Sequence, residues 1–291
     1  MSPAFYKLVT DVPVAYVFAH RVVWSVAILG VAVLARDGGA RVWHVLARPR
    51  RLLPLIGSTT VIAINWGTFL WAVAAGEVLQ SSLGYYIFPL VAVALGMVVF
   101  GERLNARQAV AVGLAVVGVT VLVAGHGVVP WISLVLAVAF AIYGWIRKAA
   151  GVDAITGLFI ETLILAVPAA GWLVWQNAAG AGHFGPGSPW LSTILVLAGP
   201  MTAAPLFLFT VAARRVRYAT VGLFFYVNPT CQFLLAVLAF GEPFTGLHAV
   251  TFACIWTALA VYSADPAILT RRRGAVTSSD TSQIAGGNRE Q

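Results

Sequence analysis

The chain has 291 residues, of which 60% are hydrophobic and only 10% are charged, and its formal net charge is +8. A soluble globular domain carries about 25% charged residues, so this composition excludes an ordinary water-soluble fold and predicts lipid as the main solvent. The basic residues fall in short segments between apolar runs, which is typical of loops that meet anionic lipid headgroups and excludes nucleic acid as the expected partner. Cys231 and Cys254 lie inside apolar runs, and no Cys/His spacing suits a metal, so we expect neither metal nor cofactor.

Nine apolar segments are long enough to cross a bilayer, because about 20 helical residues span the hydrocarbon. In chain order, the predicted spans are 14–35, 53–75, 79–100, 106–125, 129–147, 153–175, 190–213, 217–240 and 246–268. The connections between them are short and mostly carry Gly, Pro or charge. The tail, 269–291, is polar and rich in Ser, Thr and Gly, and is predicted to be disordered.

Lys and Arg occur in every second connection, and only Lys7 and Arg21 fall outside this pattern. The positive segments are the 36–52 loop, the 101–107 loop, residues 147–148, residues 214–217 and the tail. Positively charged loops stay in the cytoplasm. The pattern therefore predicts a multi-pass protein of a bacterial inner membrane with a cytoplasmic C-terminus.

Two segments read alike at an offset of 140 residues, namely Leu83–Glu102 and Leu223–Glu242. Each has a tyrosine, a mid-helix proline and a Phe-Gly-Glu ending: Tyr86, Pro89 and Glu102 in the first, Tyr226, Pro229 and Glu242 in the second. The loop charges place Glu102 inside and Glu242 outside. The two copies therefore have opposite orientations, which is the inverted repeat typical of secondary transporters.

The predicted fold is an all-α polytopic membrane protein built as an inverted 5+5 helix repeat, with nine full spans in this chain. The first repeat covers 1–125 and the second covers 126–268. The 129–147 span has only the end of a counterpart, at 3–7, where Lys7 aligns with Arg147. We therefore expect that the first helix is cut short, either because the coding region starts further upstream or because the chain is a truncated variant.

Several short runs carry a family resemblance: PAFYKL (3–8), HRVVWS (20–25), NWGTFLWAV (65–73), SLGYYIFPL (82–90), GERL (101–104), YGWIRK (143–148), TGLFIET (156–162) and NPT (228–230). In this order the chain resembles, over about 1–268, the RarD-type branch of the EamA family in the drug/metabolite transporter superfamily. The resemblance implies ten helices in a 5+5 inverted repeat, both ends in the cytoplasm, and permease-like activity on a poorly defined substrate. The branch is named for an association with chloramphenicol sensitivity.

The chain departs from this family pattern in two places. It lacks most of the first helix, and it has Phe88 where the family typically places Asn before Pro89. The second half keeps Asn228 before Pro229. The first departure bears on whether this exact chain transports, and the second indicates that one polar contact is absent from the cavity.

Arg21 and Glu161 are charged residues inside predicted spans, at equivalent positions of the two copies. A charge at the centre of a membrane helix costs about 2.5–3.5 kcal/mol on insertion scales, so it tends to face the bundle interior and to find a partner. The functional alternatives are a substrate carboxylate held by Arg21 and proton coupling at Glu161. The structural alternatives are an ion pair, which the spacing leaves open, or snorkelling toward an interface.

Further candidates for a substrate pathway are polar and aromatic residues in the spans: Asn65, Trp66, Trp71, Tyr85, Tyr86, Tyr226, Asn228 and Gln232. Their structural alternatives are interhelical hydrogen bonds and anchoring in the interfacial belt. Pro89 and Pro229 are candidate hinges, since proline frees a backbone carbonyl in the preceding turn, with a static kink as the alternative. His20 points to another face than Arg21 and is expected to be structural.

The sequence bears on three classes of function. A secondary transporter of small organic molecules that works by alternating access is favoured by the inverted repeat. A non-transporting membrane scaffold or subunit is the alternative. An intramembrane enzyme is disfavoured because no catalytic motif appears. The expected partners are membrane lipids, a small-molecule substrate and protons, and small residues such as Ala92 and Gly96 would also permit a homodimer.

Overall fold

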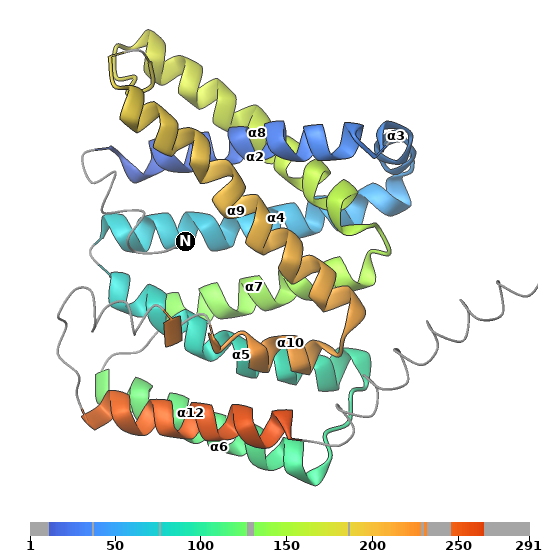
Figure 1. Ribbon diagram of the computed structural model, residues 1–291, viewed down its shortest axis with the longest axis vertical. Helices are drawn as coiled ribbons and strands as arrows, with labels where there is room; N and C mark the ends of the chain where they lie inside the picture. Colours follow the sequence, from blue (N-terminus) through green and yellow to red (C-terminus); the bar gives the residue numbers. More distant parts are fainter. Residues whose placement is uncertain are drawn as a thin grey trace, which may run out of the picture. The chain divides into compact units, whose positions relative to one another are not determined.

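The computed structural model describes residues 12–36, 38–75, 77–126, 131–185, 187–227, 230–231 and 246–264. Every regular element in this part of the chain is a helix (Figure 1). The helices are α2 (Val14–Leu34), α3 (Gly39–Leu46), α4 (Pro49–Ala74), α5 (Val78–Phe100), α6 (Ala106–His126), α7 (Trp131–Ala149), α8 (Ala154–Ala178), α9 (Pro189–Arg215), α10 (Tyr218–Phe224) and α12 (Gly246–Ser263).

Six of the described helices, namely α2, α4, α6, α7, α8 and α9, are long and apolar enough to cross a membrane. Shorter apolar stretches, Gly84–Phe100 and Ala249–Ser263, lie in α5 and α12. The span predicted at 217–240 starts with α10, but residues 228–229 and 232–240 lie outside the described residues, as do the tail and residues 1–11. An all-helical polytopic fold is confirmed, whereas nine full spans remain a prediction.

The segment 36–52, which was predicted to be a connecting loop, contains the helix α3. Its eight residues are too few to span a bilayer, so a search for spans does not find it. Val42 and Val45 are buried in a cluster with Val33 of α2 and Ile160 of α8. The helix is therefore packed onto the ends of its neighbours.

The chain forms two compact units. Unit 1 comprises Met1–Glu102 and Val129–Glu242, and unit 2 comprises Arg103–Val128 and Pro243–Gln291. In unit 2, α6 and α12 pack closely enough that a β-carbon on Gly118 would lie 3.0 Å from Cβ of Cys254. Gly125 at the end of α6 meets Leu247 at the start of α12, so the two helices are antiparallel.

Helices of the first half begin 140 residues before counterparts in the second half: Val14 and Ala154, Pro49 and Pro189, Val78 and Tyr218, Ala106 and Gly246. Three of these four pairs pack directly on each other: α2 with α8, α5 with α10, and α6 with α12. Tyr16, early in α2, shares a cluster with Leu173 of α8, whereas Val33, late in α2, shares one with Ile160. The α2–α8 pair is therefore antiparallel.

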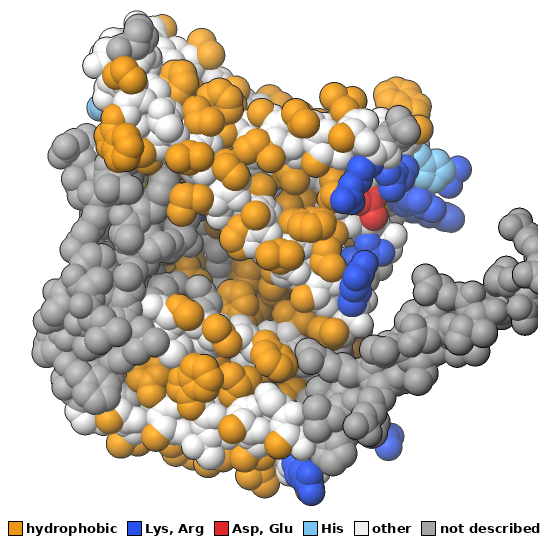
Figure 2. Space-filling view, viewed as in Figure 1, with side chains coloured by type: hydrophobic (Ala, Val, Ile, Leu, Met, Phe, Trp, Pro, Cys, Tyr) orange, Lys and Arg blue, Asp and Glu red, His pale blue; other side chains and the backbone are white. Residues whose placement is uncertain are grey.

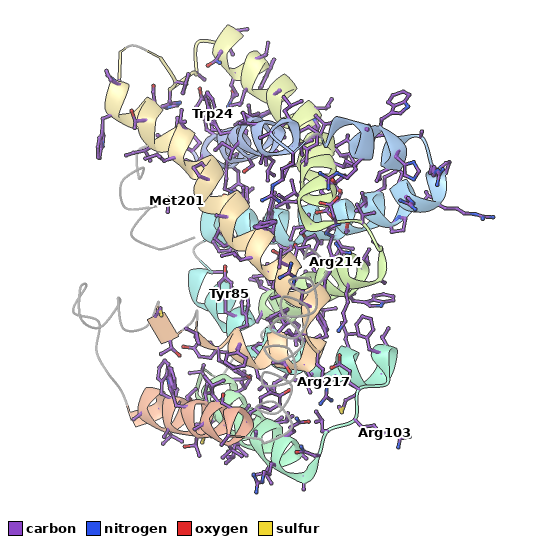
Figure 3. The ribbon with its side chains drawn as sticks, turned by 45° about the vertical axis from the view of Figure 1, so that its right-hand side comes forward. Trp24, Tyr85, Arg103, Met201, Arg214 and Arg217 are labelled. Carbon is purple, nitrogen blue, oxygen red and sulfur yellow. The ribbon has the colours of Figure 1, made fainter. Side chains whose placement is uncertain are left out.

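One end of unit 1 collects its basic side chains. The α2–α4 connection, the end of α7 and the α9–α10 connection lie there, and blue atoms gather at this end in Figure 2. Arg214 and Arg217, labelled in Figure 3, lie at the α9–α10 connection. Tyr85 of α5 and Met201 of α9 lie away from this end. We call this the basic end of unit 1.

Candidate functional site

Two opposite charges lie inside unit 1. Arg147, near the end of α7, places its Nε 3.4 Å from Oε1 of Glu161 in α8, and the two side chains are 0% and 2% exposed. Buried charges are tolerated in proteins only when they are paired and hydrogen-bonded. The contacts around this pair therefore decide what it can do.

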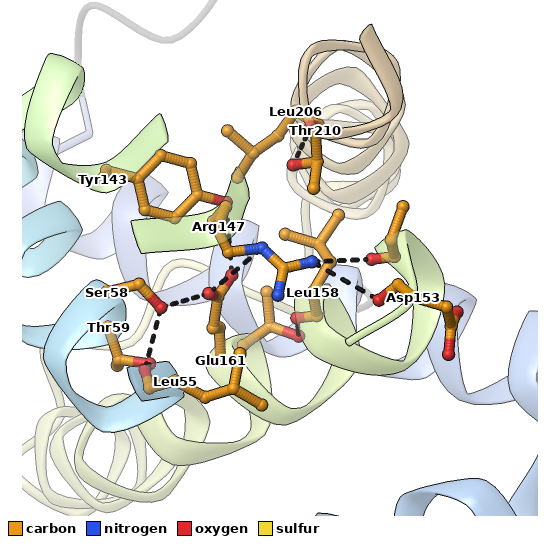
Figure 4. Close-up of polar contacts among 12 residues, drawn as sticks. Leu55, Ser58, Thr59, Tyr143, Arg147, Asp153, Leu158, Glu161, Leu206 and Thr210 are labelled. Carbon is orange, nitrogen blue, oxygen red and sulfur yellow. Dashed lines mark hydrogen bonds and ion pairs between the residues drawn. The ribbon is translucent and has the colours of Figure 1, made fainter. Parts of the chain in front are cut away.

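Three helices supply the partners of the pair (Figure 4). The Ser58 hydroxyl of α4 donates to Oε1 of Glu161, and the Tyr143 hydroxyl of α7 donates to Oε2 at 3.2 Å. Nη2 of Arg147 donates to the carbonyl oxygens of Asp153 and Ala154 at 3.4 and 3.3 Å. Nη1 of Arg147 has no hydrogen-bond partner among the described residues. Each carboxylate oxygen of Glu161 thus has a hydroxyl donor, while Nη1 of the guanidinium keeps unused hydrogen-bonding capacity.

The start of α8 positions this ion pair. Asp153 caps the helix, because its Oδ1 accepts from the backbone N–H of Thr156 at 3.0 Å. Burial raises the pKa of Asp153, but the hydrogen bonds from Thr156 and the charge of Arg41 outweigh it, so this pKa lies below its usual value. One turn later, Gly157 leaves the space that the Arg147 guanidinium fills, since a β-carbon there would collide with Nη1 and Nη2.

A cluster of five aromatic rings adjoins the pair. It is made of Phe88 (α5), Phe140 and Tyr143 (α7), Phe209 (α9) and Phe225, which follows α10. Phe88 is only 2% exposed, and its ring centroid lies 4.6 Å from that of Phe225 and 5.0 Å from that of Phe140. Tyr143 belongs both to this cluster and to the ion-pair centre, so it links the two.

Glu102 joins three helix ends at the basic end. It accepts from the backbone N–H groups of Tyr218 (2.8 Å) and Ala219 (3.1 Å) at the start of α10, and Nζ of Lys148 lies 3.2 Å away. Arg217 Nε is 3.9 Å from its other oxygen. Burial raises the pKa of Glu102, but these donors outweigh burial and hold the pKa below its usual value. We call this set the Glu102 network.

A set of neutral contacts lies at the opposite end of unit 1. The Tyr16 hydroxyl accepts from the backbone N–H groups of His183 (3.1 Å) and Phe184 (3.2 Å) and donates to Asn177 (3.2 Å). The His20 ring stacks on Phe184 with centroids 4.9 Å apart. Its two nitrogens are buried without a hydrogen-bond partner among the described residues. We call this set the Tyr16 cluster.

The comparisons with known proteins identify the family. Residues 1–124 match the EamA-like transporter family. The RarD protein of Escherichia coli (strain K12) is 41% identical over 273 residues, covering 94% of this chain and 92% of that protein. The chain is a RarD-type member of the EamA family. It therefore belongs to the drug/metabolite transporter superfamily and is a multi-pass membrane protein of a transporter family.

Other relatives support the same family assignment for this RarD-type chain. An uncharacterized transporter of Vibrio cholerae is 40% identical over 265 residues, covering 91% of this chain and 88% of that one. A Pseudomonas aeruginosa protein called chloramphenicol-sensitive protein RarD is 33% identical over 279 residues, covering 93% and 91%. A solved crystal structure shares the fold with a TM-score of 0.65 at 21% identity, over 90% of this chain and 89% of that one.

Of the two charged residues singled out in the RarD-type sequence, Glu161 pairs with Arg147. Arg21 lies elsewhere in unit 1 and is 6% exposed. Its guanidinium carbon lies 4.1 Å from the ring centroid of Phe18 and 4.5 Å from that of Trp66. Cation–π contacts of this kind help to offset the burial of a cation. The structure thus brings Arg21 and Trp66 together.

The candidates on α4 have structural contacts. Asn65 donates to the carbonyl oxygen of Leu136 at 2.8 Å and so ties α4 to α7, which fits the interhelical alternative. Trp71 is 51% exposed, and its ring centroid lies 5.4 Å from that of the exposed Trp131. That position fits the interfacial belt better than a pathway. A pathway role for both residues stays a prediction.

On α5, Tyr85 and Tyr86 are partly exposed, and Pro89 is buried inside the helix. A β-carbon on Gly222 of α10 would lie 2.9 Å from the Pro89 carbonyl oxygen and 2.8 Å from Ala92, so α10 packs closely on this segment. The small-residue face of α5 is therefore used within the chain. Tyr226 is 1% exposed. Asn228, Pro229 and Gln232 lie outside the described residues.

Sequence reasoning missed Arg147, Ser58 and Tyr143. Arg147 was placed at the end of the 129–147 span and counted with the basic connection, yet it is 0% exposed. The sequence did contain a signal for this pair. Glu161 needed a buried cation, and Arg147 lies close before the connection that leads into α8, the helix of Glu161. Ser58 and Tyr143 carried no such signal, because single hydroxyl groups are common in membrane helices.

Proposed function

We propose that this RarD-type protein is an inner-membrane secondary transporter of small organic molecules, which works by alternating access and exchanges protons at Glu161. The observation that carries this proposal is the buried Arg147–Glu161 pair, held between α4, α7 and α8. Ionisable groups inside membrane helices are costly and are found along substrate and proton pathways. Family membership and the transporter names of relatives support the general class.

The helix register supports an inverted repeat. Four helices start 140 residues before their counterparts, and α2–α8 and α6–α12 are antiparallel pairs. Two copies threaded in opposite directions can exchange conformations about a shared site, which is the basis of alternating access. The basic end of unit 1 would face the cytoplasm, because positive connections are retained there, and the C-terminus would lie on that side.

In this proposal, the Glu102 network holds the cytoplasmic ends of the helices together when the transporter is closed on that side. It links the end of α5 to the end of α7 and the start of α10, and Lys148 also donates to the carbonyl oxygen of Val216 at 3.2 Å. An end closed by charge-assisted hydrogen bonds must break them to open. In this proposal, the network forms when the cytoplasmic end is shut and breaks when it opens.

Arg21 is our candidate for holding an anionic group of the substrate. The rings of Phe18 and Trp66 would keep the guanidinium oriented, and a guanidinium suits the planar geometry of a carboxylate. Tyr85, Tyr86 and Tyr226 would line the path for amphiphilic compounds. The relative named for chloramphenicol sensitivity makes chloramphenicol the first compound to test.

The test is flux in inverted membrane vesicles with an imposed pH gradient, measured over a compound panel that includes chloramphenicol. We expect Glu161→Gln to abolish the dependence of flux on the gradient, whereas Glu161→Asp keeps part of it. Variant Arg147→Gln/Glu161→Gln controls for a purely structural pair, since it removes both charges. Normal gradient-driven flux in that variant would contradict proton exchange at Glu161, and absence of flux for every compound would favour a scaffold.

A further inference from the structure

A cavity of about 340 Å³ opens at the basic end, and it borders the surroundings of the ion pair at Asp153, whose carbonyl oxygen accepts from Arg147. Its walls come from α3, the first turn of α4 and the connection into α8. They comprise Ala40, Arg41, His44, Val45, Arg51, Gly151, Val152, Asp153 and Thr156. The cavity is thus formed by these three segments, with basic side chains in its walls. The proposed transport cycle assigns it no role.

The helix α3 presents three different faces. Val42 and Val45 are buried against unit 1. Arg41 and His44, three residues apart, share a second face, with Arg48 beyond the helix end in the same direction. Trp43 is on a third face and is 71% exposed. Figure 1 shows α3 end-on where α2 and α4 run across the view, so α3 lies crosswise to them. This is the arrangement of a helix that lies in a membrane interface.

Charge around the cavity is strongly positive. Arg41 and Arg51 line it, and Arg48 and Arg50 are exposed close by. The charge of Arg48, with burial and the charge of Arg51, lowers the pKa of His44. Asp153 is the acidic residue of the lining, and its carboxylate is occupied in capping α8. One nitrogen of Arg41 donates to the carbonyl oxygen of Arg36 at 2.8 Å, which steadies that side chain.

We propose that this cavity binds the phosphate of an anionic phospholipid headgroup from the leaflet at the basic end, through Arg41 and Arg51. Guanidinium groups bind phosphate with two parallel hydrogen bonds. A lipid suits the site better than a free phosphate ion because the helices around the cavity also carry exposed apolar side chains on other faces: Trp43 of α3, Leu34 at the end of α2 (72% exposed) and Leu53 in α4 (64% exposed). In this proposal those side chains contact the acyl chains of the bound lipid.

The test is native mass spectrometry of the full chain released from detergent with added phosphatidylglycerol or phosphatidylcholine. We expect phosphatidylglycerol to be retained preferentially. Each basic residue near a membrane surface contributes about 1 kcal/mol to binding of anionic lipid, so Arg41→Gln/Arg51→Gln should weaken retention about 30-fold. The matched control is Arg214→Gln/Arg215→Gln, which removes two exposed arginines that do not line the cavity.

Further arms separate the sources of phosphate. Trp43→Ser should weaken retention of phosphatidylglycerol, and glycerol 3-phosphate should not displace the lipid at equal concentration. Displacement by glycerol 3-phosphate would overturn the assignment to lipid. An equal loss in the control variant, or equal retention of phosphatidylcholine, would overturn the site itself. If the double variant fails to fold, the same retention measurement on Arg51→Gln alone, with Arg215→Gln as its control, tests the site.

Discussion

The described contacts at the two ends of unit 1 are of different kinds. At the basic end, the Glu102 network and the Arg147–Glu161 pair join α4, α5, α7, α8 and α10 through charges. At the other end, the Tyr16 cluster joins α2 to residues 183–184 with a neutral hydroxyl and stacked rings. Charge pairs respond to pH and salt, whereas stacked rings respond mainly to the loss of packing. The contacts at the two ends should therefore be weakened by different conditions.

The largest effect is expected at the ion pair. Arg147→Gln leaves Glu161 buried without its cation, and breaking a buried pair in this way costs about 3–5 kcal/mol. Arg147→Gln/Glu161→Gln should recover most of that loss. Unfolding by a denaturing detergent, followed by circular dichroism, measures both. A double variant as unstable as the single one would show that the charges do not depend on each other.

At the other end, Tyr16→Phe removes one donor and two accepted hydrogen bonds while it keeps the ring. The two N–H groups are only part-buried, so the loss of their acceptor should cost about 1 kcal/mol for each, at the low end of the range for unsatisfied donors. We expect amide hydrogen exchange at His183 and Phe184 to accelerate, with no dependence on salt. Unchanged exchange at both amides would mean that the loop is held by the rings alone.

Glu102→Gln tests the basic end with a smaller change. The amide can still accept from Tyr218, but it loses the charge that faces Lys148 and Arg217, so we expect a loss of about 1–2 kcal/mol. Because the pKa of Glu102 is depressed in the folded protein, its contribution is present above its usual pKa and is lost as pH falls through the lower folded value.

The difference between the Glu102→Gln variant and the unmodified protein should therefore be full at neutral pH and shrink below about pH 4.5. Added salt should also shrink it. Thermal unfolding at several pH values and salt concentrations checks both trends. A difference that stays constant from pH 7 to pH 3 would contradict the depressed pKa.

The smallest effect concerns the cap of α8. Asp153→Ala removes the acceptor for the Thr156 N–H and should cost about 1 kcal/mol. Asp153→Asn keeps an acceptor and is the matched control, so it should unfold within a few tenths of a kcal/mol of the unmodified protein. Equal losses in the two variants would assign the effect to the charge rather than to the cap.

The helices could be predicted well from the sequence because lipid demands long apolar runs, and α2, α6 and α8 start within a residue of their predicted spans. The partners of the buried charged residues could not be predicted from the sequence, because they depend on which helices pack together. Sequence reasoning placed Glu161 in a span and left its partner open, and it counted Arg147, at the end of the 129–147 span, with the basic connection. Helix α3 was missed because its eight residues are too few to give the length signal of a span.

Gly157 has a consequence for variation at its codon. Every missense change of a glycine codon adds a β-carbon, and here that atom would strike the Arg147 guanidinium and push it off Glu161. Saturation mutagenesis under selection should therefore return glycine at position 157 even where the rest of α8 accepts many replacements. In unfamiliar sequences, a glycine four residues before an intramembrane glutamate would mark the proteins that keep this arrangement.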